Sequence, residues 1–340
     1  MHSPRPGARI IVNGGARELS AEPGRPLLFS LMGSGVLIPS ACGGRASCGQ
    51  CRVRILSGAG RHVPEERAIL TEAEMARGVH LACQVRVEGE VRVAIPDGYL
   101  HARQYTTTVA SIRDLAPGMR EIVLEIGGPV PMTFKAGQYV QFLLPGTEDA
   151  YQPVYRAYSI ASAPSSGTRL TLLFGRVPEG VTTSYVFDRL SVGDQVKVNG
   201  PFGEFFLRES RDDIILVAGG SGMAPIRGML MDMAEKRVGR PARFFFSART
   251  PRDLFYQEEM RSLERALPDF RFVPVLSHPT PADQWPGEKG PIAAALHRLL
   301  GTLDHHEAYL CGSPGMIEAS IAALKERGLA PERIFFDKFS

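Results

Sequence analysis

Four of the five cysteines in this chain share one pattern, formed by Cys42, Cys48, Cys51 and Cys83. The first three follow the spacing C-x5-C-x2-C, and the fourth comes after a further 31 residues. Such spacing suits a [2Fe–2S] cluster, which takes three thiolates from one irregular loop and a fourth from a distant strand end. Because glycine adopts positive φ at low cost, it lets backbone N–H groups turn toward cluster sulfurs, and this loop contains Gly43, Gly44 and Gly49. The pattern predicts a protein that moves single electrons.

Other uses of cysteine fit this spacing less well. A zinc site built from four cysteines usually shows two C-x2-C pairs, whereas this chain has one pair and two outliers. Disulfides need an oxidising compartment, and a Rieske centre needs two histidine ligands, which the loop lacks. Zinc is therefore the main alternative to the cluster.

Composition sets broad limits on the class of protein. The 340 residues are 44% hydrophobic and 22% charged, as in a soluble protein of two or three domains. Residues 1–100 hold 12 arginines, no lysine and 9 acidic residues, so they carry the whole net charge of +3, which is too little for nucleic-acid binding. No apolar run approaches the ~18 residues of a transmembrane helix, and the first residues lack the apolar core of a signal peptide. We expect a cytoplasmic protein without a transmembrane segment or nucleic-acid partner.

The order of predicted elements divides the chain into three segments. Residues 1–100 combine short alternating strands, one main helix starting near Pro26 and the long cysteine loop, which predicts the β-grasp fold of ferredoxins. Residues 104–208 are a series of short strands separated by turns, which predicts a closed or nearly closed antiparallel β-barrel. Residues 211–340 alternate apolar strands with helices, which predicts an α/β domain with a doubly wound parallel sheet.

A glycine-rich loop, Gly219-GSGMA-Pro225, lies between a buried strand and a helix in the third segment. Its small residues let the backbone approach a pyrophosphate, and we expect Gly219, Gly220 and Gly222 to bind a nucleotide at the helix N-terminus. A plain strand-to-helix turn is the alternative. Cys311 also lies at the carboxyl end of a predicted strand, where open α/β sheets bind ligands. The alternative interpretation of Cys311 is a buried structural thiol.

The barrel segment contains residues suited to a flavin nucleotide. Arg156 can pair with a phosphate, while Tyr158, two residues on and on the same strand face, can cover a flat ring. Hydroxyl groups that suit phosphate oxygens follow Gly180, at Thr182, Thr183 and Ser184. The alternatives are an ordinary strand and a polar turn before a helix.

Taken in order, five motifs resemble the ferredoxin–NADP reductase superfamily, namely Arg156-AYS, Gly200-PFGEF, Gly219-GSGMAP, Ala248-RTPRDLFY and Cys311-GSP. With the cluster motif at the amino end, the chain most resembles the F subunit of the sodium-pumping NADH:quinone reductase and its soluble oxygenase-reductase relatives. The resemblance covers nearly the whole chain. It implies an FAD-binding barrel after the ferredoxin domain, followed by an NAD-binding domain.

The same resemblance implies roles for single residues. Arg156 and Thr183 would hold FAD phosphates, Tyr158 would lie against the isoalloxazine, and Ser159 would lie near its reactive nitrogen. Phe339 would cover the other ring face and shift to admit the nicotinamide, and Gly220, Gly222 and Cys311 would line the nicotinamide-nucleotide site. Ser159, Cys311 and Phe339 are thus the predicted catalytic residues.

Hydride donation delivers two electrons at once, a [2Fe–2S] cluster takes one, and a flavin works in both modes. We therefore predict a reductase that passes electrons from NADH to FAD, to the cluster and on to an acceptor protein of an oxygenase or demethylase system. The alternatives are the NADH-oxidising subunit of a membrane quinone reductase and a redox sensor. The cluster region carries Arg45, Arg52 and Arg54, which predicts an acceptor with an acidic docking patch.

Overall fold

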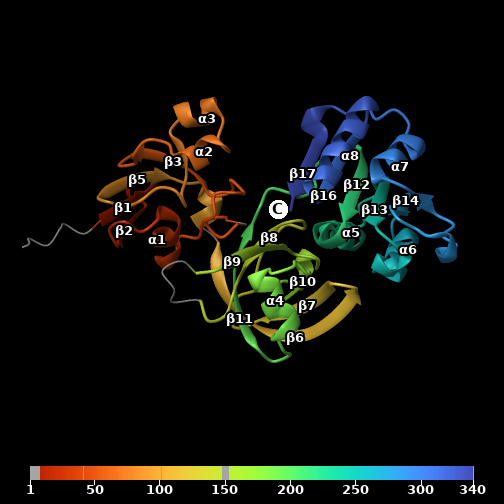
Figure 1. Cartoon of the computed structure of the whole chain (residues 1–340), viewed down its shortest axis with the longest axis horizontal. Coiled ribbons are helices and arrows are strands. Elements are labelled where there is room, and N and C mark those ends of the chain that lie inside the picture. The colour runs from red at the N-terminus through yellow and green to blue at the C-terminus, as the bar shows by residue number, and fades with distance from the viewer. Residues whose placement is uncertain (1–7, 41, 101, 148–152, 340) are drawn as a thin grey trace, which may run out of the picture. The chain divides into compact units, whose positions relative to one another are not determined.

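The structure is a computed structural model that describes residues 8–40, 42–100, 102–147 and 153–339. The described residues form three sheets, shown in Figure 1 with their helices. The chain divides into two compact units, and each unit is discontinuous in sequence. The first unit comprises Met1–Thr106, Val140–Ala157 and Val196–Phe202, and the second comprises Thr107–Tyr139, Tyr158–Gln195 and Gly203–Ser340.

The first sheet is the predicted β-grasp. Its strand order is β2-β1-β5-β3-β4, in which β1 pairs parallel with β5 and the other pairs are antiparallel. The helix α1 (Leu27–Gly33) is buried along six of its residues because nearly its whole sequence is apolar. The strands are β1 (Ala8–Val12), β2 (Arg17–Ala21), β3 (Arg52–Ser57), β4 (Val79–Leu81) and β5 (Glu90–Ala94).

Two short helices between β3 and β4 were not predicted. The helix α2 (Pro64–Arg67) starts with proline, and α3 (Glu72–Ala76) starts with a capping box in which Thr71 and Glu74 bond each other's backbone N–H. Both signals are local and readable, yet each helix is too short to show an apolar period.

The second sheet is the predicted barrel, with strand order β10-β7-β6-β11-β8-β9. It closes through an antiparallel bridge between Ile160 and Leu172, supported by a bond from the Ala161 N–H to the Thr171 carbonyl (2.8 Å). A helix, α4 (Val181–Asp188), follows β10. The strands are β6 (Arg103–Ala116), β7 (Met119–Ile126), β8 (Tyr139–Leu143), β9 (Tyr155–Ser159), β10 (Arg169–Gly175) and β11 (Gln195–Phe202).

The third sheet is parallel, with order β15-β14-β13-β12-β16-β17, and confirms the doubly wound α/β prediction. The order reverses at β12, because β12 pairs with both β13 and β16. Open sheets of this kind bind ligands at such a switch point. The strands are β12 (Asp213–Gly219), β13 (Ala242–Ala248), β14 (Phe270–Leu276), β15 (Glu288–Lys289), β16 (His306–Gly312) and β17 (Ile334–Lys338).

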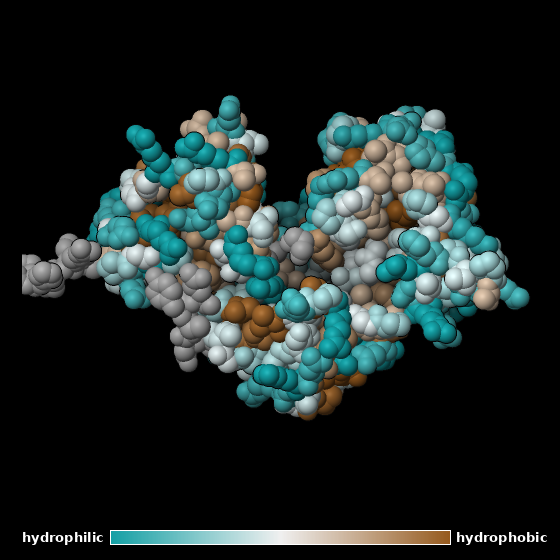
Figure 2. Space-filling view, viewed as in Figure 1, coloured by the Kyte–Doolittle hydropathy of each residue, from teal (hydrophilic) through white to brown (hydrophobic). Residues whose placement is uncertain are grey.

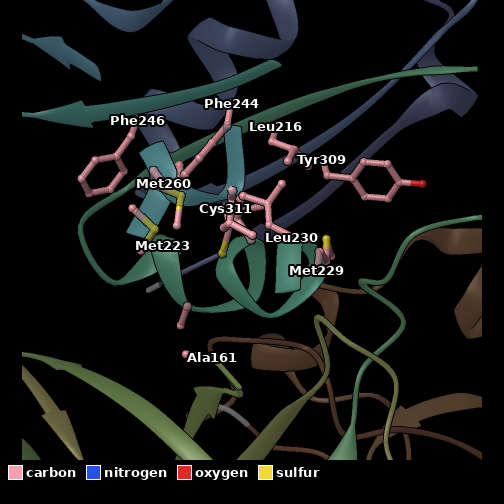
Figure 3. Close-up of a cluster of buried hydrophobic side chains, with 14 of the residues drawn as sticks. Ala161, Leu216, Met223, Met229, Leu230, Phe244, Phe246, Met260, Tyr309 and Cys311 are labelled. Atoms are coloured by element: carbon pink, nitrogen blue, oxygen red, sulfur yellow. The ribbon is translucent and has the colours of Figure 1, made fainter. Parts of the chain in front are cut away.

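Helices cover both faces of this sheet. Side chains alternate along β12, so Leu216 packs with α5 and α6 while Val217 packs with α7 and α8. Figure 3 shows the first of these two cores, with Cys311 among Leu216, Leu230 and Phe244. The helices are α5 (Met223–Glu235), α6 (Gln257–Ala266), α7 (Ile292–Leu299) and α8 (Pro314–Glu326). Among the described residues, no helix is both long and apolar enough to span a membrane.

Candidate functional site

The structure brings the four predicted ligands together as two pairs of thiols. The sulfurs of Cys42 and Cys48 lie 3.4 Å apart, and Cys51 shares a hydrogen bond with Cys83. Cys42, Cys51 and Cys83 are buried, whereas Cys48 is only partly buried. The loop therefore presents one pair nearer the surface through Cys48.

This pairing bears on the choice between a cluster and a zinc ion. In the part of the chain that the structure describes, no three His, Cys, Asp or Glu side chains converge on one metal-ion position. Two sulfurs bound to one tetrahedral metal at ~2.3 Å lie ~3.7 Å apart, close to the Cys42–Cys48 distance. One iron held by each pair is the arrangement that a dinuclear cluster needs, so the residues present fit a [2Fe–2S] group.

Within each pair of thiols, a hydrogen bond shifts the two pKa values in opposite directions. The hydrogen bond from Cys48 lowers the pKa of the Cys42 thiol and raises the pKa of Cys48. The bond between Cys51 and Cys83 likewise lowers the pKa of Cys83 and raises that of Cys51. Thiols bind a metal as thiolates, so metal binding would replace the protons that these pairs share.

Glycine shapes the cluster loop as the sequence predicted. Gly43, Gly44 and Gly49 all have positive φ. A side chain on Gly44 would come within 2.8 Å of the Phe29 ring, and one on Gly49 would come within 2.7 Å of Ile69. The turned backbone brings the Gln50 N–H to 3.5 Å from the Cys48 sulfur, which is the kind of contact that tunes a cluster.

The barrel places the predicted flavin residues on two elements. Arg156 and Tyr158 are both on β9, and the Tyr158 ring packs on Phe174 with centroids 4.0 Å apart. Ser159 ends the same strand and is buried. The residues that follow β9 bond to β10 through Ile160 and Ala161, and the Ala161 carbonyl accepts a bond from Arg227 on α5.

The hydroxyls at the start of α4 differ in what they already bond. The Thr183 hydroxyl closes the turn before the helix through the Val177 N–H (3.2 Å) and the carbonyls of Val177 and Gly180. The Thr182 hydroxyl is buried and has no partner among the described residues. An orphaned donor at a helix N-terminus fits an anionic phosphate. The geometry favours Thr182 over Thr183 for this contact, and the roles of both, like that of the half-buried Ser184, stay predictions.

The surface around α4 has a mixed character. Figure 2 shows small groups of hydrophobic side chains on a mostly hydrophilic face, one of them over the barrel near α4. Large hydrophobic side chains are exposed at both ends of this helix, at Val177, Val181 and Val192.

The glycine loop lies at the switch point of the parallel sheet. Gly219 ends β12, and Gly220 has a φ of +56° with open space around it. A side chain on Gly222 would come within 2.2 Å of the Cys311 carbonyl oxygen, so only glycine lets the loop rest on the end of β16. The structure thus joins Gly219, Gly220, Gly222 and Cys311 at one edge of the sheet.

The backbone of Cys311 contacts the glycine loop, whereas its side chain lies in the hydrophobic core. The thiol is fully buried in the core of Figure 3, and this burial raises its pKa well above the usual range. Phe339 packs against the same core and donates its N–H to the Gly312 carbonyl (3.0 Å). Both residues lie at the predicted nicotinamide site, and their catalytic roles stay predictions.

Asp337 belongs to this group and was missed. It pairs in register with Cys311 on the neighbouring strand, so the two side chains share a face of the sheet. Burial raises the pKa of the Asp337 carboxyl to about 6. Its position one residue before Lys338 in a short terminal strand gave no signal in the sequence.

A second missed group fixes α5 to the barrel. Arg227 donates to the Ala161 carbonyl (2.7 Å) and pairs with Glu259 through two bonds (2.6 and 3.0 Å). Tyr256 lies 4.7 Å beneath the Arg227 guanidinium and donates a short hydrogen bond to Glu121 on β7. Because α5 starts at the glycine loop, this network ties the predicted nucleotide loop to Ala161, just after the end of β9.

Comparison with known proteins agrees with this arrangement. Residues 10–88 match the 2Fe-2S iron-sulfur cluster binding domain, 106–207 the oxidoreductase FAD-binding domain, and 216–321 the oxidoreductase NAD-binding domain. The F subunit of the Na(+)-translocating NADH-quinone reductase of Neisseria meningitidis is 33% identical, with 97% of this chain and 91% of the relative covered. Its counterpart in Methylococcus capsulatus is equally similar, at 33% with the same coverage.

Solved structures resemble the whole chain. The cytochrome P450 reductase GcoB of Amycolatopsis is 31% identical with a TM-score of 0.78, and 98% of each chain is covered. The ferredoxin reductase in carbazole 1,9a-dioxygenase is 25% identical with a TM-score of 0.75 over 100% of both chains.

Fold and site together define an NAD(P)H-dependent oxidoreductase that transfers electrons through three cofactors, a [2Fe–2S] cluster, FAD and NAD(H). The chain belongs to the ferredoxin–NADP reductase superfamily, in the group with an amino-terminal [2Fe–2S] domain. The fold class and the family predicted from the sequence are confirmed. The boundaries 1–100, 104–208 and 211–340 and the individual site residues stay predictions.

The ligand set is tested by Cys48→Ser. Loss of one thiolate should remove or impair the cluster and abolish reduction of cytochrome c. Reduction of FAD by NADH should continue, because its predicted residues lie in other parts of the chain. Visible absorption, electron paramagnetic resonance and stopped-flow reduction measure the three effects. A variant with a normal cluster spectrum and full cytochrome reduction would remove Cys48 from the ligand set.

The two neighbouring threonines provide a matched pair. Thr182→Val should weaken FAD binding about two- to tenfold, the effect of one hydrogen bond worth about 0.5–1.5 kcal/mol, while the stability of the FAD-free protein stays the same or rises. Thr183→Val should instead lower stability, because it opens the turn before α4. Titration of FAD and thermal unfolding measure both. The reverse pattern would assign the phosphate contact to Thr183.

Asp337 predicts a pH dependence. A carboxylate beside the nicotinamide would stabilise the positive charge that develops as hydride leaves, so FAD reduction by NADH should slow as the pH falls below about 6 and Asp337 is protonated. Asp337→Asn should be slower by about tenfold or more above that pH and lose the pH dependence. Glu318→Gln, which removes an exposed carboxylate paired with Lys338, is the control. An unchanged profile in Asp337→Asn would contradict the role.

Proposed function

We propose that this chain is the reductase component of an oxygenase or demethylase system and delivers electrons from NADH to a separate acceptor protein. The observation that carries the proposal is the likeness to the cytochrome P450 reductase GcoB over 98% of both chains at 31% identity. The reductase in carbazole 1,9a-dioxygenase gives the same kind of support. NADH supplies a hydride, the acceptor takes single electrons through the cluster, and flavin chemistry connects the two.

A second candidate has its own support. Identity of 33% over 97% of this chain to the F subunit of the quinone reductase favours a role as the NADH-oxidising subunit of a membrane complex. Affinity purification of the tagged chain from its own cells, followed by mass spectrometry, distinguishes the two. An oxygenase component that accepts electrons on addition of NADH supports the first, whereas stoichiometric membrane subunits support the second.

The contacts of the three arginines change which of them we expect to contribute to the basic docking face. Arg45 donates to the Cys42 carbonyl (3.0 Å), and Arg52 pairs with Glu74 (3.0 Å) and donates to the Gly49 carbonyl. These two arginines hold the cluster loop, so they are poor tests of docking. Arg54 is exposed on β3, directly after the loop, and forms no ion pair among the described residues. It is the better candidate for the docking face.

Charge reversal at Arg54 tests this face. Arg54→Glu should slow electron delivery to the acceptor several-fold at low salt and flatten its salt dependence, because charge complementarity acts on encounter and is screened over ~8–10 Å. Reduction of FAD by NADH should be unchanged. Arg17→Glu makes the same charge change on β2, at the opposite edge of the sheet, and should have little effect. Equal effects of both variants would contradict a local docking face.

A further inference from the structure

The middle of strand β8 contains an amide with an unusual environment. All five residues of β8 are buried, so both of its faces are covered. Gln141 is fully buried, and its Nε2 donates to the carbonyls of Ser40 (3.0 Å) and Ile38 (3.4 Å). These carbonyls belong to the segment that enters the cluster loop just before Cys42. Gln141, Ile38 and Ser40 all belong to the first compact unit.

The cluster loop meets the neighbouring strand β9 at Gly43. With a φ of +64°, Gly43 lies so close to β9 that a side chain there would come within 2.8 Å of the Tyr155 carbonyl oxygen and 2.6 Å of the Arg156 guanidinium. That guanidinium in turn donates to the Tyr155 carbonyl (2.7 Å). The backbone beside the first cluster ligand therefore rests on Tyr155 and Arg156, the β9 residues that belong to the same unit.

The amide of Gln141 is costly to keep at this position. Its Oε1 is buried without a hydrogen-bond partner in the described residues, and an unsatisfied buried acceptor costs about 1–3 kcal/mol. Leucine or methionine would fill the same space without that cost. Packing therefore does not explain the residue, whereas the two bonds to the loop carbonyls do.

From these contacts we infer that Gln141 and Gly43 are positioning residues for electron transfer from FAD to the cluster. Gln141 holds the entry of the cluster loop on β8, and Gly43 permits backbone contact with β9. Together they set the position of the cluster loop relative to Arg156, the predicted flavin residue that lies in the same unit. In the step concerned, bound reduced FAD would give up one electron and the bound cluster would take it up. The inference rests on the route from NADH through FAD to the cluster and not on the acceptor.

Gln141→Met tests the amide at nearly constant volume. In stopped-flow experiments on the holoenzyme, FAD reduction by NADH should be unchanged, while electron transfer from FAD to the cluster slows about 10–100-fold, the size of effect expected from a small misplacement of reacting groups. Gln141→Asn keeps an amide donor and should lose less. The electron paramagnetic resonance spectrum of the reduced cluster should match the wild type. Hydrogen exchange of the segment 36–44 should become faster in Gln141→Met.

Gly43 provides an independent test with a matched control. Gly43→Ala should slow the same transfer step, because the loop must move off the Tyr155 carbonyl. Gly14→Ala places the same residue type at a similar φ (+68°) in the turn between β1 and β2 of the same unit, with no atom within 4 Å of the new side chain. It has the same backbone strain without the contact, and should transfer electrons at the wild-type rate.

The outcomes separate this inference from the electron route itself. If the wild-type chain passes no electrons from reduced FAD to the cluster, the route is wrong and the inference falls with it. If the wild type does so, but Gln141→Met equals it in transfer rate and in hydrogen exchange, only the inference is overturned. A Gln141→Met variant that loses FAD reduction by NADH would likewise overturn it, because the amide would then support the barrel as a whole.

Discussion

Redox groups that exchange electrons must lie close together, and in this chain the loops predicted to hold them come into backbone contact with neighbouring strands. Glycine makes each contact possible. Gly222 rests on the Cys311 carbonyl and Gly43 on the Tyr155 carbonyl, where a side chain would come within 2.2 and 2.8 Å. Any larger residue at these two positions would push a cofactor loop away from the strand beside it. These contacts need support from the surrounding structure.

Buried polar bonds provide that support. In the second unit, Arg227, Glu259, Tyr256 and Glu121 form a continuous network between α5, α6 and the barrel strand β7. In the first, Gln141 bonds the carbonyls of Ile38 and Ser40, just before the cluster loop. Paired charges cost less to bury than isolated ones, and the directional bonds of both groups hold the packed elements in place. These bonds therefore keep the glycine loops at a fixed distance from the carbonyls that they contact.

Local sequence patterns could be interpreted before the structure was known, whereas contacts between residues far apart in the sequence could not. The cysteine spacing, the glycine loop and the change from short strands to alternating strands and helices are local patterns, and they predicted the fold class and the cluster. The family and its FAD-binding barrel came from the resemblance of five motifs to a known superfamily. Gln141 and Arg227 could not be found this way. Their partners are 101 and 66 residues away in sequence, and a single buried Gln or Arg has no pattern of its own. Thr182 and Thr183 are adjacent and chemically alike, so only the bonds already made by Thr183 tell them apart.

The first compact unit is assembled from three separate stretches of sequence, and the strands beneath its cluster loop come from residues beyond 139. During synthesis, the cysteines therefore leave the ribosome well before β8 and β9 do. The cluster loop can make its contacts with these two strands only after they have been synthesised. The same discontinuity limits the exchange of parts between related reductases. A recombinant chimera cut between residues 100 and 104 would pair a cluster loop with strands that evolved against another loop, so exchange of the cluster domain has to bring β8 and β9 with it.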